Sequence, residues 1–377
     1  MIWPAQVLAG LACAIWVYLV FCNGRYWTAG ERDTRKVAPD PVAWPRVVAV
    51  VPARDEADVI ARSIASLAAQ DYPGSFNIIL VDDGSRDGTA AIARPAGGDR
   101  LTILQGADLP AGWTGKLWAV SQGIAASGEA DYLWLTDADI EHAPDTLRSL
   151  VARAEGDGRV LVSLMAKLRC HSLAESAFVP AFIYFFQMLY PFARANADRG
   201  QAAAAGGCML VRHDALERAG GIGMIRGALI DDCAFGALMK AQGRIWLGLT
   251  DRSRSIRPYE GTGAIAAMIS RSAYAQLDYS PLKLLGTLIG LALVFGLPPG
   301  LALFGHGWPR VMAAMAWGLM ILSFQPMLRF YRRSPFWGVV LPLIAAFYAG
   351  CTLLSGWQHW RGRGGMWKGR AQAMARS

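Results

Sequence analysis

The sequence predicts an α/β domain with a mainly parallel sheet, flanked by membrane-spanning helices. Short apolar runs alternate with helical patterns between residues 46 and 258, which is typical of βαβ units. Long apolar segments lie before and after this region. Of the 377 residues, 54% are hydrophobic, and the formal net charge is +8. This balance indicates a membrane protein with a basic cytoplasmic surface, and we expect no nucleic-acid partner.

Residues 1–24 are predicted to be a retained membrane anchor. Ile2–Phe21 is long enough to cross a bilayer as a helix. Basic residues follow this segment, whereas a cleaved signal peptide carries its charge first. The positive-inside rule therefore places the next part of the chain in the cytoplasm. Residues 25–45 contain Pro39, Pro41 and Pro45 and are expected to form an extended linker.

Strands and helices are expected to alternate within residues 46–258. The predicted strands are Val47–Val51, Phe76–Val81, Leu101–Leu104, Tyr132–Thr136, Val160–Leu164, Cys208–Val211 and Ile245–Leu247. The predicted helices cover residues 56–70, 117–127, 144–154 and 229–242, with shorter ones after Asp87 and from His213.

Polar clusters follow three of these strands. They are Pro52-Ala53-Arg54-Asp55-Glu56, Asp82-Asp83-Gly84-Ser85 and Asp137-Ala138-Asp139. In parallel α/β sheets, ligands bind beyond the carboxyl ends of the strands, where the strand order reverses. Three polar clusters on one edge are more than chance turns would give, so we expect a ligand site there.

Asp137 and Asp139 are candidate metal ligands. Residues two apart in an extended chain point to the same side, so the two carboxylates can converge. Their oxygens suit Mg²⁺ or Mn²⁺, with phosphate oxygens completing the coordination. The alternative is an ordinary turn after a strand. The cysteines and histidines do not indicate a disulfide framework or a zinc site. The six cysteines form no C-x-x-C pair, and the five histidines are isolated.

Six short motifs resemble, in order and spacing, those of family 2 glycosyltransferases. They are Pro52–Glu56, the Gln70-Asp71-Tyr72-Pro73 turn, Val81–Ser85, Gly115-Lys116, Asp137-Ala138-Asp139 and Asp231-Asp232. The resemblance covers residues 46–258 and implies a GT-A fold, which is a nucleotide-binding α/β domain. The anchor, the Gly-Trp-Thr-Gly-Lys loop and the C-terminal apolar segments further resemble the hopene-associated glycosyltransferases of hopanoid-making bacteria. Ceramide glucosyltransferases have a similar layout.

The resemblance implies roles at the donor site. Asp82 and Asp83 would hold the uracil or ribose of a UDP-sugar, and Pro52, Ala53 and Glu56 would shape the nucleotide pocket. Asp137 and Asp139 would bind Mg²⁺ or Mn²⁺ together with the donor. Two further residues have alternative roles. Lys116 would either contact the diphosphate or be a surface lysine. Gly207, with Gly206, would either let the backbone approach the donor sugar or form an ordinary turn.

Asp232 would be the catalytic base that takes the proton of the acceptor hydroxyl, supported by Asp231. The family has Glu at the position of Asp231, so this is a departure, and the competing role for Asp232 is a helix N-cap. Processive members carry a Q-x-x-R-W motif, of which only Arg271 is present here. This argues against a polysaccharide synthase. Trp113 faces either the acceptor or the membrane, and Arg54 and Arg169 are expected at the solvated surface.

The C-terminal third is expected to meet the membrane. Residues 259–283 form a predicted amphipathic interface segment, 284–356 hold three apolar segments, and 357–377 form a basic tail. Residues 177–192 are expected to lie in the interface or to line an acceptor groove. Three crossings after a cytoplasmic domain would leave the basic tail outside, against the positive-inside rule. A re-entrant Leu284–Phe304, containing Pro298-Pro299, would remove this conflict.

We therefore expect a membrane-bound inverting glycosyltransferase that moves a sugar from a nucleotide-sugar, a UDP-sugar, to a lipid acceptor in hopanoid biosynthesis. Its place would be the inner membrane, with several spans and a cytoplasmic catalytic domain. Ceramide or a polyprenyl phosphate is the alternative acceptor. A non-catalytic membrane scaffold with a degenerate domain is the alternative function. It is disfavoured because degenerate domains usually lose the metal pair or the base.

Overall fold

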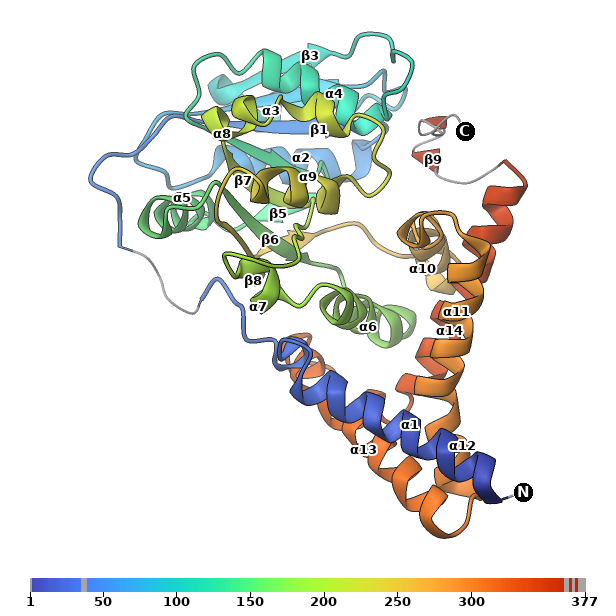
Figure 1. Ribbon diagram of the computed structural model, residues 1–377. Coiled ribbons are helices and arrows are strands. Elements are labelled where there is room, and N and C mark those ends of the chain that lie inside the picture. Colours follow the sequence, from blue (N-terminus) through green and yellow to red (C-terminus); the bar gives the residue numbers. More distant parts are fainter. Residues whose placement is uncertain (1, 35–38, 363–365, 368–369, 372–377) are drawn as a thin grey trace. The chain divides into compact units, whose positions relative to one another are not determined.

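A computed structural model describes residues 2–34, 39–362, 366–367 and 370–371. The chain forms two compact units (Figure 1). The sheet unit comprises Glu31–Arg169, Arg194–Pro258 and Met366–Ser377. The helical unit comprises Met1–Gly30, Cys170–Ala193 and Tyr259–Gly365. Each unit therefore gathers segments that are far apart in the sequence.

The sheet unit contains an eight-stranded sheet in the order β3-β2-β1-β4-β7-β6-β8-β5. The strands are β1 Val47–Ala53, β2 Phe76–Asp82, β3 Leu101–Gln105, β4 Tyr132–Thr136, β5 Ile140–His142, β6 Leu161–Lys167, β7 Cys208–Arg212 and β8 Ile245–Ser255. Strands β3, β2, β1 and β4 are parallel. β7 is antiparallel to β4 and β6, and β5 is antiparallel to β8. The predicted α/β fold is confirmed, and the sheet is mixed rather than parallel throughout.

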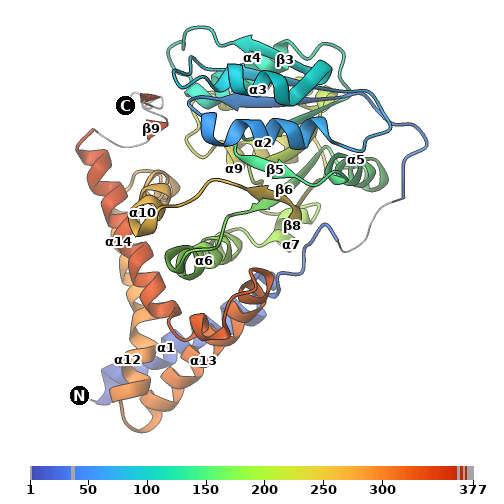
Figure 2. The same cartoon turned by 180° about the vertical axis from the view of Figure 1, so that it is seen from behind.

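Helices cover both faces of this sheet. One face packs on α2 (Ala57–Ala68), α3 (Thr89–Gly97) and α5 (Thr146–Asp157). The other packs on α4 (Gly115–Ala125), α8 (His213–Arg218) and α9 (Asp231–Lys240). Figure 2 shows α2 in front of the sheet and α9 behind it. Successive β1 residues alternate between the two cores, as the pleat of a strand requires.

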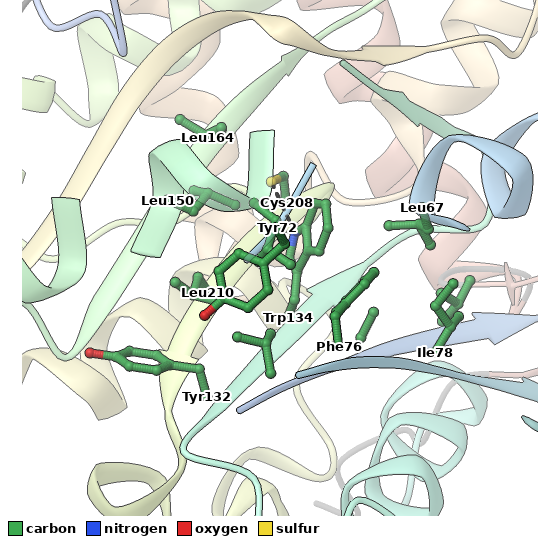
Figure 3. Packing of buried hydrophobic residues seen from close by; sticks show 14 of the residues in the cluster. Leu67, Tyr72, Phe76, Ile78, Tyr132, Trp134, Leu150, Leu164, Cys208 and Leu210 are labelled. Atoms are coloured by element: carbon green, nitrogen blue, oxygen red, sulfur yellow. Dashed lines mark hydrogen bonds between the residues drawn. The ribbon is translucent and has the colours of Figure 1, made fainter. Parts of the chain in front are cut away.

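The first core is built around Trp134 of β4, which is fully buried (Figure 3). Its ring lies 6.0 Å from that of Phe76 and 4.6 Å from that of His142. The indole nitrogen donates to the Cys208 thiol at 3.3 Å. Truncating a buried aromatic of this size costs about 3–5 kcal/mol. This packing fixes β4, and β4 ends at the Asp137 loop.

All seven predicted strands are present among the described residues, and β5 was not predicted. β8 is much longer than the predicted Ile245–Leu247. Its second half is polar, but Ser253 and Ser255 are buried while Arg254 between them is exposed. Small polar residues thus occupy the inward positions of this half of β8. The alternation of apolar and polar residues that marks a strand in a sequence is therefore absent there. Glu31–Asp33 also lie along β8, since Asp33 N–H donates to the Leu249 carbonyl at 3.1 Å.

Among the residues that the structure describes, the helical unit has three helices that are long and apolar enough to cross a membrane: Pro4–Phe21, Pro281–Phe304 and Gly307–Phe330. These correspond to α1 (Ile2–Phe21), to α11 (Pro281–Leu291) continued by α12 (Leu297–Phe304), and to α13 (Gly307–Phe330). The shorter apolar helix α6 (Leu173–Leu189) covers most of the aromatic stretch. The helical unit also contains α10 Gly261–Ser270 and α14 Leu341–Trp360, α7 Phe192–Asn196 joins the two units in the chain, and the short strands β9 Met366–Trp367 and β10 Arg370–Ala371 belong to the sheet unit.

The double proline does not break the helix Pro281–Phe304. A π-helical segment, Ala292–Gly296, joins α11 to α12 just before Pro298 and Pro299. The Val294 carbonyl would accept from residue 298 in an α-helix or from residue 299 in a π-helix, and both are prolines without an N–H. The indole N–H of Trp16 in α1 donates to this carbonyl at 2.8 Å. Trp16 is fully buried and lies edge-on to Phe295.

Candidate active site

Two strand-end loops, after β1 and β2, are joined by hydrogen bonds. Asp55 has a positive φ of 51°, and its N–H donates to Ser85 Oγ at 3.0 Å. The N–H of Arg86 donates to Asp55 Oδ1 at 2.8 Å. Glu56 is the N-cap residue of α2, and its N–H donates to Thr89 Oγ1 at 2.8 Å. The left-handed turn at Asp55 thus directs Glu56 towards the same sheet edge as the second loop.

The predicted donor residues Asp82 and Asp83 are both buried. Oδ1 of Asp82 accepts from the N–H of Ser85 at 2.9 Å. Arg54 donates to the Asp83 carbonyl, and its guanidinium lies 3.5 Å from Asp83 Oδ2. The Arg54 side chain is only 13% exposed. The prediction that Arg54 is solvated was wrong: burial of Asp83 beside it requires a countercharge.

β1 and β4 are neighbours at the point where the strand order reverses, since β2 and β3 lie on the other side of β1. Pro52 and Ala53 end β1, and Asp137 follows β4. The chain is not extended between Asp137 and Asp139, because Ile140 N–H closes a turn on the Asp137 carbonyl at 3.2 Å. The two carboxylates are therefore presented by a turn rather than by the pleat of a strand.

Lys116, at the start of α4, connects the Asp137 loop to α9. Its ammonium lies 2.9 Å from Asp137 Oδ1 and 3.1 Å from Asp231 Oδ2. The Lys116 side chain is 21% exposed, so it is not a surface lysine. Its two carboxylate partners raise the pKa of Lys116 against the effect of burial. One cavity of about 20 Å³, enough for one water molecule, is lined by Lys116, Asp137, Asp231, Pro52 and Gly206.

Asp231 and Asp232 occupy the first turn of α9, where the helix dipole favours negative charge. The N-cap is Ile230, so Asp232 is not a capping residue. Its carboxylate accepts from the N–H of Cys233 at 2.8 Å and of Gly206 at 3.4 Å. Burial raises the pKa of Asp232 to about 6, with a further rise from Asp231 and an opposing effect of Lys116. This value suits a proton acceptor near neutral pH.

Gly206 and Gly207 have different surroundings. A Cβ at Gly206 would lie 3.4 Å from Lys116 Nζ and 3.5 Å from Asp232 Cβ. A Cβ at Gly207 would lie 3.2 Å from Ala166 and 3.4 Å from Ile140, which is tighter than most real contacts. Packing against these two residues therefore explains glycine at 207. The structure brings Gly206, rather than Gly207, to the carboxylates.

Arg257 was not predicted as a site residue, although it contacts two that were. Its Nε donates to Asp139 Oδ2 at 3.0 Å, and its Nη2 donates to Glu56 Oε2. Ser255 Oγ also donates to Asp139 Oδ2, at 3.2 Å. The only available signal was the alternation of residues 250–255, which extends β8 to the neighbourhood of Asp139.

His142 supports the Asp137 loop from within the core. It is 3% exposed, and its ring nitrogens pair with Thr136 Oγ1 and Ser253 Oγ, both at 2.9 Å. Burial lowers the pKa of His142 to about 3, so the ring is neutral. Thr136 immediately precedes Asp137. This network gives His142 a structural role.

Trp113 packs inside the sheet unit. Its ring lies 5.2 Å from that of Trp118, edge to face, and a Cβ at Gly223 would lie 3.7 Å from it. The N–H of Thr114 donates to the Arg226 carbonyl at 2.9 Å, which joins this loop to residues 222–226. The two joined loops lead directly into α4, which carries Lys116, and towards α9, which carries Asp231.

The carboxylate pair fits a hard divalent cation only as a partial donor set. Lys116 contacts Oδ1 of Asp137, while Ser255 and Arg257 contact Oδ2 of Asp139. Among the described residues, the other oxygen of each carboxylate is left for a cation. The same residues include no group of three or more His, Cys, Asp or Glu side chains that could hold a metal ion. Further ligands would have to come from a diphosphate or from water.

Comparison with known proteins finds similarity to glycosyltransferases. Residues 48–220 match the profile of glycosyl transferase family 2. An N-acetylglucosaminyltransferase of Rhizobium leguminosarum bv. viciae is 31% identical over 129 residues, which are 34% of this chain and 29% of that protein. A beta-monoglucosyldiacylglycerol synthase of Synechocystis sp. is 32% identical over 114 residues, covering 29% of this chain and 23% of that protein.

The chain thus spans less than a third of the length of these two relatives. A solved structure extends the likeness in fold. The mannosyltransferase PcManGT from Pyrobaculum calidifontis, in complex with GDP-Man and Mn²⁺, superposes with a TM-score of 0.56 at 19% identity. The match covers 93% of this chain and 99% of that one. The chain therefore has a GT-A-like α/β fold, within which residues 48–220 match the glycosyl transferase family 2 profile.

Proposed function

We propose that this protein is a membrane-bound, metal-dependent, inverting glycosyltransferase that moves a sugar from a UDP-sugar to a lipid acceptor. The observation that carries the proposal is Lys116, which lies between Asp137 on the donor side and Asp231 of the acidic pair. One ammonium group thereby joins the carboxylate expected to meet the donor to the pair expected to activate the acceptor.

The strand-end loops would bind the donor. Asp82 and Asp83 would hold the uridine, and Pro52, Ala53 and Glu56 would shape its pocket. Gly207, with Gly206, would let the backbone approach the donor sugar. Asp137 and Asp139 would hold Mg²⁺ or Mn²⁺, which supplies charge stabilisation to the leaving diphosphate when bound. Lys116 is close enough to Asp137 to add a second positive charge there.

Asp232 would act as the base, with Asp231 in support. The acceptor oxygen forms a bond to the anomeric carbon as the bond from that carbon to the diphosphate breaks. The electron pair leaves with UDP, and the acceptor proton moves to Asp232. A single displacement of this kind inverts the anomeric centre. A positioned base contributes about 10²–10⁴-fold to such a step.

Three apolar helices support a lipid acceptor. We propose that α1, the continuous helix Pro281–Phe304, and α13 each cross the bilayer, while α14 lies in the interface. Arg25 after α1, Arg329 at the end of α13, and the basic 357–377 segment then share one side with the sheet unit. This arrangement satisfies the positive-inside rule, which three crossings after the sheet unit would not. We place the sheet unit at the cytoplasmic face of the inner membrane.

Labelling with a membrane-impermeant thiol reagent checks this arrangement. A cysteine introduced by His306→Cys, between α12 and α13, should react from outside, and Arg333→Cys should react only after permeabilisation. The reverse pattern would overturn the proposed topology.

Among lipids, we propose a hopanoid acceptor, supported by the resemblance in the anchor, the Gly-Trp-Thr-Gly-Lys loop and the C-terminal segments. Ceramide and polyprenyl phosphate are the alternatives. A phosphate acceptor is already ionised and would depend less on Asp232.

The full chain in nanodiscs, incubated with Mn²⁺, a panel of UDP-sugars and a bacterial lipid extract, tests the function. The expected product is a new glycolipid, identified by mass spectrometry, and its aglycone identifies the acceptor. Failure of the protein both to bind UDP with Mn²⁺ and to form a glycolipid would favour the non-catalytic scaffold instead.

A further inference from the structure

Arg257 connects two acidic residues that come from different parts of the sequence. Glu56 follows β1, Asp139 follows β4, and Arg257 lies just beyond the end of β8. Glu56 is 7% exposed, and the side chain of Asp139 is 17% exposed. Two carboxylates drawn this close in a poorly solvated place repel each other unless a cation lies between them. Arg257 supplies that cation.

The guanidinium group suits this position in a way that an ammonium group does not. Nε and Nη2 lie on one edge of the planar group, and here each donates to a different carboxylate. An arginine in this arrangement fixes the distance and direction between its partners, whereas a lysine offers a single point charge. The segment around it is also held, because Ile256 N–H donates to the Asp139 carbonyl at 2.9 Å and Ser255 Oγ donates to its side chain.

All of these side-chain contacts use Oδ2 of Asp139, so the orientation of the carboxylate is set and Oδ1 is presented on the other side. We propose that Arg257 is a positioning residue that holds Asp139 for the cation and ties it, through Glu56, to the nucleotide pocket. This inference rests on the proposed function.

It follows that Arg257 increases the gain in nucleotide affinity that the cation provides. It affects the affinity for the nucleotide alone, or for the cation alone, much less. In its absence Glu56 and Asp139 would separate, and the cation would meet a carboxylate whose orientation is no longer fixed. The measurable quantity is therefore the ratio of UDP affinity with Mn²⁺ to UDP affinity without it.

Titration calorimetry of the full chain in nanodiscs measures this ratio, with UDP as the probe and Mn²⁺ present or absent. Arg257→Met should lower the ratio about tenfold, as expected for the loss of hydrogen bonds to charged groups. Arg257→Lys should restore only part of it. Arg254→Met is the matched control, since Arg254 lies in β8, is exposed and donates to the Asp251 carbonyl, and its ratio should equal that of the wild type.

An unchanged ratio in Arg257→Met would overturn the inference. So would a raised ratio, which would mean that Arg257 competes with the cation for Asp139. Should Arg257→Met not fold, Glu56→Gln removes the charge at the other end of the contact and should lower the ratio by about threefold; an unchanged ratio there also counts against the inference. Failure of the wild type to bind UDP with Mn²⁺ would instead overturn the proposed function.

Discussion

The two units of this protein satisfy their buried polar groups by different means. At the strand ends of the sheet unit, partly buried acidic and basic side chains alternate. Lys116 lies between Asp137 and Asp231, and Arg257 lies between Glu56 and Asp139. Each cation serves two carboxylates from separate segments of the chain. Such clusters are costly to desolvate, so they persist where they bind or convert a ligand.

Within the apolar helices of the helical unit the corresponding groups are neutral. Glu175, at the start of α6, is the charged exception: it is fully buried and accepts from the N–H groups of His171 and Ser172. The hydroxyls of Tyr26 and Tyr184 pair at 3.0 Å, and Tyr184 pairs with Ser323 Oγ at 2.7 Å. The Trp16 indole donates to the Val294 carbonyl. A lipid environment offers no water to an unpaired group and disfavours charge, so neutral donors and acceptors are the economical solution there. The contrast separates a unit built for ionic chemistry from one built for the bilayer.

The largest effect is expected at Asp232. Asp232→Asn keeps the shape of the side chain but removes the proton acceptor, so turnover should fall about 10²–10⁴-fold. UDP binding in the presence of Mn²⁺ should change little. Steady-state kinetics and calorimetry on the same nanodisc preparation separate the two. Near-normal turnover with normal UDP binding would sink the role of Asp232 as base.

Lys116→Met should have the next largest effect and should also move the pH profile. Since Lys116 lowers the pKa of Asp232, its removal raises that pKa. The base must be ionised to act, so activity is lost as pH falls through its pKa, at about 6 in the wild type. The acidic limb of log kcat/KM against pH should therefore shift upward in Lys116→Met, with roughly a tenfold loss at neutral pH, the size expected for a lost charged hydrogen bond.

Lys116→Arg, which keeps the charge, is the control and should retain the wild-type limb more closely. An acidic limb that stays in place in Lys116→Met would show that Lys116 does not act through Asp232. A purely structural role would lower activity equally at every pH.

The sequence predicted candidate site residues but not the contacts between them. Asp137, Asp139, Asp231 and Asp232 were proposed because short motifs mark the ends of strands and helices. The contact of Lys116 with Asp231 could not be predicted, because it joins segments more than a hundred residues apart through tertiary packing.

Residues that depend on burial were missed for a different reason. Arg257 follows a polar strand in which serines take the inward positions, so no apolar period marks it. Arg54 was predicted to be solvated because a charged residue in a loop usually is, but burial of Asp83 reverses this expectation. At Pro298 the sequence indicates an interrupted helix, whereas in the structure a π-helical segment continues it and Trp16 donates to the Val294 carbonyl.

Trp16→Phe tests the contribution of a neutral hydrogen bond in the helical unit, from the Trp16 indole to the Val294 carbonyl. The aromatic ring is kept, but the Val294 carbonyl loses its partner, which should destabilise the helical unit by about 1–3 kcal/mol. Thermal unfolding in nanodiscs would measure the change. Trp308→Phe is the control, because Trp308 is 69% exposed, and its stability should match the wild type. Equal stability of the two variants would contradict the role given to Trp16.

The smallest effect is expected at Arg62. Its ion pair lies in the same unit as that of Arg257 but is exposed, so it separates the effect of charge from the effect of burial. Arg62 pairs with Glu141 at 2.8 Å, and Glu141 lies two residues after Asp139. The two side chains are 64% and 39% exposed, so water already solvates both charges. Arg62→Met should change the free energy of unfolding by less than about 0.5 kcal/mol and leave the Mn²⁺-dependent gain in UDP affinity intact. Denaturant unfolding and calorimetry would measure both. A large loss in either would mean that proximity to the Asp139 loop, rather than contact with two poorly exposed carboxylates as at Arg257, gives an arginine its importance here.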